Sequence, residues 1–100
     1  MLKIPKKIKI GGLVYDIVKV DEITVQDTPV AGSISPSRQE IQLETGYKDN
    51  FSDTVFLHEI LHGIAYHTGR MDLFEDESII DCFANGLTAL INDNKGILAT

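Results

Sequence analysis

The chain has 100 residues, which suffices for a single domain over 1–100 and leaves no room for a second hydrophobic core. Its formal net charge is −6. This charge argues against nucleic acid as the main partner, because phosphate binding needs clustered basic side chains. The sequence has no signal peptide pattern and no run of about 18 apolar residues, so we expect no membrane partner and a cytoplasmic location.

The first half of the chain has the pattern of β-strands. Charged and apolar residues alternate over 7–10, and a β-rich segment covers 13–20 after two glycines, which predicts a hairpin or one bent strand. Two further short strands are predicted, Ser33-Ile34 and Glu40 to Glu44. They flank a turn sequence at 35–38.

The second half has the pattern of helices. Ser52 can cap a helix that begins at Asp53, and Gly69 is a natural stop for it. A second helix is predicted after Asp72, with an apolar stripe made of Ile79, Ile80, Phe83, Leu87, Leu90 and Ile91. Asp72 and Glu75 stand at capping-box spacing. The predicted fold is therefore α+β: a small antiparallel sheet of about three to four strands packed on two helices.

The most informative motif is His58-Glu59-Ile60-Leu61-His62, an HExxH pattern. Positions four apart share one face of a helix, so two imidazoles can each offer one nitrogen to a zinc ion. Glu59 lies one residue round the helix, where it can act as general base on a water activated by the metal. The alternative interpretation is a helix surface on which two histidines and a glutamate merely meet solvent. Burial of the flanking apolar residues argues against it, because unpartnered imidazoles there would be costly.

A third protein ligand is needed for a tight site. His67 is a poor candidate, because nine residues after His58 it points to the opposite side of the helix. Glu77 is a better one. It shares a helix face with Asp81, which can accept the free N–H of a ligating histidine and fix its tautomer. Equally, Glu77 and Asp81 can belong to a solvated acidic helix start, and spacing alone leaves both interpretations open.

HExxH followed by Glu-x-x-x-Asp on a second helix resembles the gluzincin group of zinc peptidases. The short chain, and the segment 77–84 in particular, is similar to minigluzincin and ImmA/IrrE-type proteins of phages and other mobile elements. The resemblance covers roughly residues 30 to 92. It implies a zincin-like fold, Zn²⁺ as cofactor, His58, His62 and Glu77 as metal ligands, Glu59 as catalytic residue and Asp81 as the group that orients a histidine.

By the same resemblance, an antiparallel edge strand beside the zinc would hold a peptide or protein substrate by strand addition. Either Ser33-Ile34 or Glu40 to Glu44 would be that edge. The larger relatives have a downstream His or Tyr that stabilises the oxyanion, whereas this chain has no His, Tyr or Arg after Asp81. The candidates for a substitute are Tyr15, Arg38, Tyr47 and Tyr66.

The function predicted from the sequence is hydrolysis of peptide bonds by a zinc metallopeptidase, with activity that is slow, selective or absent. Two alternatives use the same residues: a zinc-bound module that captures a peptide or protein without turnover, and a purely structural zinc site. Glu59 favours catalysis, and the absent oxyanion donor favours the binding module. Cys82 is the single cysteine and excludes an intrachain disulfide. We interpret it as a buried structural thiol, and Asn85 as either a neighbour of the site or an ordinary polar position.

Overall fold

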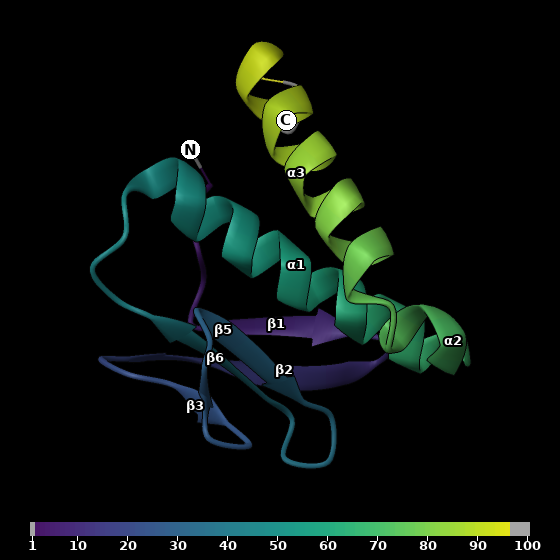
Figure 1. Ribbon diagram of the computed structural model, residues 1–100. Coiled ribbons are helices and arrows are strands. Elements are labelled where there is room, and N and C mark those ends of the chain that lie inside the picture. Colours follow the sequence, from purple (N-terminus) through teal and green to yellow (C-terminus); the bar gives the residue numbers. More distant parts are fainter. Residues whose placement is uncertain (1, 97–100) are drawn as a thin grey trace.

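The computed structural model describes residues 2–96 and is α+β (Figure 1). Its elements in chain order are β1 Lys7–Ile10, β2 Leu13–Val20, β3 Thr24–Val25, β4 Thr28–Pro29, β5 Gly32–Ser35, β6 Glu40–Glu44, α1 Asp49–His67, α2 Met71–Phe74 and α3 Glu77–Asp93. The predicted α+β class is confirmed, with one short helix more than expected. No helix in the described part of the chain has the length and apolar character needed to cross a membrane.

The main sheet has four strands in the order β1-β2-β6-β5, and β3 and β4 form a separate two-stranded hairpin. β1 and β2 form the expected hairpin, and β5 and β6 are antiparallel. β2 and β6, however, are parallel, so the predicted wholly antiparallel sheet is wrong. The reason lies in the connection 21–39. Within this connection the chain forms β5, which runs antiparallel to β2 but does not pair with it. The turn after β5 then places β6 between β2 and β5. β5 is therefore an edge strand and β6 is central.

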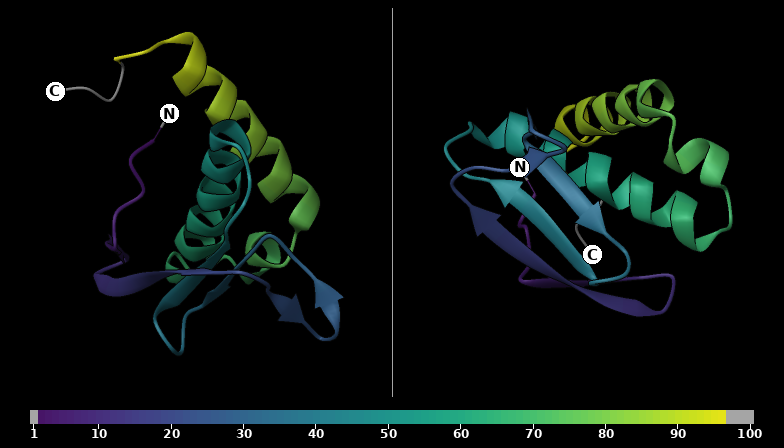
Figure 2. Two further views of the ribbon diagram at one scale, coloured as in Figure 1. Left: turned by 90° about the vertical axis from the view of Figure 1, so that its left-hand side faces the viewer. Right: turned by 60° about the horizontal axis from the view of Figure 1, so that its bottom comes forward.

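α1 lies across one face of the sheet, and α3 packs on α1 at a steep angle (Figures 1 and 2). The core between α1 and the sheet contains Ile10, Tyr15, Ile41, Leu43 and Phe56. Close packing depends on Gly63, where a Cβ would lie 3.0 Å from Ile34 Cδ1 and 3.1 Å from Ile10 Cδ1. The glycine that follows His62 thus lets this end of α1 approach the sheet.

The predicted start of α1 is wrong. The helix begins at Asp49 instead of Asp53, and its N-cap, Lys48, makes no side-chain cap hydrogen bond. Asp49 supplies the negative charge that favours the helix N-terminus. The predicted end is close, because α1 ends at His67 and Gly69 follows with φ +79°.

The second helical region is divided in two. Asp72 lies within α2 and pairs with Arg70, so it caps nothing. Instead, Asp76 caps α3 by accepting a hydrogen bond of 3.1 Å from the N–H of Ile79. α3 begins at Glu77, so the residue predicted as the third metal ligand lies in the first turn of this helix.

The buried face of α3 also differs from the predicted stripe. Ile80, Ala84 and Thr88 are buried, whereas three of the predicted core residues are exposed, namely Ile79, Phe83 and Leu90. The predicted buried thiol is wrong as well, because Cys82 is exposed. The physical reason is that α3 packs on α1 and α2 and covers no sheet, so the narrow strip of Ile80, Ala84 and Thr88 forms its buried face.

Candidate metal centre

Three side chains from two helices meet at the junction of α1 and α3. His58 and His62 lie one turn apart on α1, and Glu77 reaches them from the first turn of α3. Nε2 of His58 is 3.0 Å from one carboxylate oxygen of Glu77, and Nε2 of His62 is 2.9 Å from the other. The two Nε2 atoms are 3.0 Å apart. These residues lie close enough together to bind a metal ion.

The other nitrogen of each imidazole is held by an acceptor. Nδ1 of His62 is 2.7 Å from the carbonyl oxygen of Phe74, which can only accept, so this nitrogen carries the proton. Nδ1 of His58 is 2.8 Å from Oδ1 of Asp81 and donates to that carboxylate. The predicted partnership of Asp81 with a histidine is therefore present. In the neutral imidazoles, both Nε2 atoms keep a free electron pair.

The convergence of these atoms tests whether the residues fit a metal. With both imidazoles neutral, two Nε2 electron pairs and a carboxylate point at one another, which is repulsive unless a cation lies among them. Zinc–ligand bonds of about 2.0–2.2 Å in a tetrahedron separate neighbouring ligand atoms by about 3.3 Å. The separations of 2.9 to 3.0 Å need only a small expansion to reach that value. The donor set of two imidazoles and one carboxylate is also one that zinc accepts.

Glu59 is buried, with 6% of its surface exposed, and no hydrogen bond to its side chain is found within residues 2–96. Burial, with smaller contributions from the nearby charges of Glu77 and Asp81, raises the pKa of this carboxyl to about 8. No side-chain oxygen of the described residues is fully enclosed without a partner, so the Glu59 carboxyl opens onto the cleft, where a proton can be exchanged. Glu59 is not part of the three-residue cluster, so it is free to do other chemistry.

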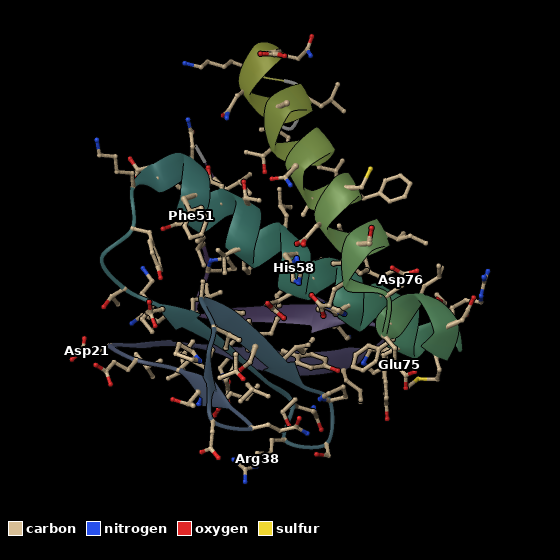
Figure 3. The ribbon with its side chains drawn as sticks, viewed as in Figure 1. Asp21, Arg38, Phe51, His58, Glu75 and Asp76 are labelled. Atoms are coloured by element: carbon tan, nitrogen blue, oxygen red, sulfur yellow. The ribbon has the colours of Figure 1, made fainter. Side chains whose placement is uncertain are left out.

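A cleft of about 950 Å³ runs over this cluster. One wall is formed by β5 and the β3–β4 hairpin, and the other by α1 and the start of α3 (Figure 3). Along this cleft, Val25, Val30, Phe51 and Val55 are apolar, and Glu59, Glu75, Glu77 and Asp81 are acidic. Asn85 also lines it, which favours the first of the two interpretations given above for that residue.

β5 presents unused main-chain groups to the cleft. The N–H of Glu44 donates to the carbonyl of Ala31, so residues 31, 33 and 35 bond to β6 in the alternation of an antiparallel ladder. The N–H and C=O groups of Gly32 and Ile34 therefore point away from β6. Because β5 is an edge strand, no other strand of the sheet receives them. Of the two segments named as candidate edges, Ser33-Ile34 holds this position and Glu40–Glu44 does not.

His67 lies away from the cluster, as the helical-face argument predicted. Its Nε2 is 2.6 Å from the hydroxyl of Tyr15, which is fully buried. Tyr47 donates to Glu44, and Arg38 lies at the β5–β6 turn, at the end of the sheet opposite His58 (Figure 3). Neither they nor Tyr66 line the cleft. None of the four substitutes proposed for the oxyanion donor therefore lines the cleft.

Two contributors to this site were not identified from the sequence. One is the carbonyl of Phe74, which holds His62 and has no signal in the sequence because every residue has a carbonyl group. The other is Gly32, where a Cβ would lie 3.0 Å from Oε2 of Glu59. Gly32 is the first residue of β5 and directly precedes the predicted strand Ser33-Ile34, and a glycine in a strand can mark the close approach of another segment.

Comparisons with protein-family models, with curated proteins and with solved structures found no match to this chain.

Proposed function

We propose that the protein is a zinc-dependent metallopeptidase of the gluzincin kind. The observation that carries the proposal is the pairing of two features in one cleft. Two imidazoles and a carboxylate converge on one point, and Glu59, largely buried and with no side-chain hydrogen bond among the described residues, lies next to them on the same cleft. A structural metal site needs the first feature and has no use for the second.

His58, His62 and Glu77 would hold the metal, while Asp81 and the carbonyl of Phe74 keep both imidazoles in the tautomer that binds it. When bound, zinc would polarise the substrate carbonyl and make water acidic enough to attack at neutral pH. Glu59 would take a proton from the attacking water on its carboxylate and pass it to the leaving amine. Its pKa of about 8 in the metal-free protein means that a nearby cation is needed to keep it ionised as a base.

The substrate would be a peptide segment in extended conformation. Its main chain would pair with the outward N–H and C=O groups of Gly32 and Ile34 on β5. This places a peptide bond between the edge of the sheet and the cluster on α1 and α3, since both line one cleft. A folded protein would have to offer a loop or terminus, because a paired strand has no free main-chain groups.

A binding module that holds a peptide without turnover remains the second candidate. It is favoured by the lack of a Tyr or Arg substitute in the cleft, because loss of one oxyanion donor costs about 10²–10³ in rate.

The two candidates are distinguished by Glu59→Gln. This change keeps the size of the side chain and removes its basicity, so zinc content and fold should be retained while peptidase activity falls by about 10²–10⁴. Zinc-loaded wild type and variant are incubated with a proteome-derived peptide library, and new termini are identified by mass spectrometry. Asp72→Asn, which changes a carboxylate of α2 outside the cleft, is the matched control and should cleave like the wild type.

Cleavage by the wild type and the control, with loss in Glu59→Gln, supports the peptidase. Equal cleavage by all three proteins points to a contaminant. If none cleaves but wild type and Glu59→Gln retain the same peptides on a column, the binding module is the correct candidate.

A further inference from the structure

Gly32, the first residue of β5, lies against Glu59. Its φ angle is outside the left-handed region, so its backbone conformation is open to any residue. Space is what excludes a side chain here. A Cβ at position 32 would lie 2.7 Å from Cγ1 of Val55, 3.0 Å from Oε2 of Glu59 and 3.3 Å from its Cγ.

Neither neighbour can move aside without consequence. Val55 is β-branched and lies on α1, where one χ1 rotamer is strongly preferred, so rotation of its side chain is costly. The carboxyl of Glu59 is confined because the residue is buried between α1 and β5. A methyl group at position 32 must therefore displace Glu59, or push β5 away from α1.

The groups that converge on the metal position are independent of this contact. His58, His62 and Glu77 come from α1 and α3, and none of their atoms is among the three that lie nearest to a Cβ at position 32. Position 32 thus affects the proposed base and the edge of β5 while leaving the ligands in place.

We propose that Gly32 is a positioning residue: its missing side chain provides the room in which the Glu59 carboxyl is held against the cleft. The proposal rests on the function proposed above, since it concerns the base of that reaction. It also explains why a glycine, which stabilises a strand less than alanine does, stands at the start of β5 beside Glu59.

The test compares Gly32→Ala with Val55→Ala, with the double variant Gly32→Ala/Val55→Ala, and with Gly86→Ala. Gly86 is the matched control, because a Cβ there meets nothing within 4 Å. The double variant removes the contact with Cγ1 of Val55 and keeps the one with Glu59, which separates packing from positioning. Three quantities are measured: zinc affinity by chelator competition, the carboxyl ¹³C chemical shift of Glu59 in the metal-free protein, and cleavage of the peptide library.

For Gly32→Ala we expect unchanged zinc affinity, a displaced Glu59 carboxyl resonance and cleavage reduced about 10- to 100-fold, the scale of a misplacement of about 1 Å. The double variant should keep both defects relative to Val55→Ala, which is its reference, and Gly86→Ala should resemble the wild type. Recovery in the double variant would mean that Gly32 serves packing alone, and a wild-type resonance in Gly32→Ala would overturn the proposal outright. If Gly32→Ala fails to fold, the Glu59 resonance and the cleavage rate of the double variant, compared with those of Val55→Ala, decide the question. A wild type that binds no zinc would refute the proposed function, while the ¹³C measurement would still decide the placement of Glu59.

Discussion

At the scale of single residues, Glu59 is the side chain whose chemistry depends most on its surroundings. Burial raises its pKa from 4.5 to about 8, with smaller contributions from Glu77 and Asp81. Between these two pH values the folded metal-free protein keeps a proton on Glu59 that the unfolded chain has lost. Stability therefore falls as the pH rises through this range, by about 1.4 kcal/mol per unit of pKa shift and on the order of a few kcal/mol in all.

The fall of stability with rising pH gives a direct prediction for the metal-free protein. The free energy of unfolding of the wild type should fall between pH 5 and pH 9 relative to that of Glu59→Gln, which mimics the protonated carboxyl. Urea denaturation at several pH values, with the variant as reference, measures the difference and cancels the titration of other groups. Parallel curves for the two proteins would show that Glu59 is not held in a desolvated position.

A second prediction at this scale separates the two residues considered as third ligand. Glu77→Ala should weaken zinc binding strongly, because its carboxylate lies 2.9 to 3.0 Å from both Nε2 atoms. His67→Ala should leave zinc affinity unchanged and lower stability by about 1–3 kcal/mol, because the buried hydroxyl of Tyr15 loses its partner. Isothermal titration with zinc and urea denaturation of both variants check this. Loss of zinc binding in His67→Ala together with unchanged zinc affinity in Glu77→Ala would exclude Glu77 as the ligand.

At the scale of helices and strands, sequence patterns predicted some features correctly and others not. Four-residue spacing predicted correctly that His58 and His62 share a face, because a helix of any length imposes it. Helix starts were predicted poorly, because several acidic or hydroxyl residues near each start can cap and only tertiary contacts select one. The carboxylate of Asp72 pairs with Arg70, and Asp76 is the residue that caps α3.

The cap at Asp76 should influence the metal site. Asp76→Ala removes the hydrogen bond to the N–H of Ile79 and should cost about 1 kcal/mol of stability. Because Glu77 is the first residue of α3, fraying there should also weaken zinc binding several-fold. Asp72→Ala is the control and should change zinc affinity little, since Asp72 pairs with Arg70 and does not line the cleft. Thermal unfolding and chelator competition measure the two effects, and equal zinc affinity in all three proteins would contradict the coupling.

At the scale of the whole molecule, the α+β class could be predicted because alternation and helical periodicity are local properties of the sequence. The parallel pairing of β2 and β6 could not, because it depends on how the connection 21–39 folds over the sheet. The same limit applies to the buried face of α3. Phe83 is more hydrophobic than Ala84, yet Ala84 is buried and Phe83 is 61% exposed, because close approach to α1 needs a small side chain.

The attachment of α3 leads to the last prediction. Its buried contacts with α1 come from Ile80, Ala84 and Thr88, and Thr88 adds one hydroxyl pair with Thr54 at 2.8 Å. This is a thin interface for a helix, so a metal shared between α1 and α3 should contribute much of its stability. Free zinc at one hundred times its Kd should stabilise the protein by about 2.7 kcal/mol, which raises the Tm by at least about 10 °C in a chain of this length.

Hydrogen exchange of the metal-free protein should show the amides of α3 opening before those of β2 and β6, and zinc should slow their exchange selectively. Calorimetry with zinc and with a chelator provides the change in Tm. His58→Ala is the control that should lose both responses to zinc, because it removes a ligand and leaves the interface of Ile80, Ala84 and Thr88 intact. Uniform protection of all elements by zinc would mean that the metal stabilises the whole domain without tying α3 to α1. No change in Tm or exchange would refute the metal centre itself.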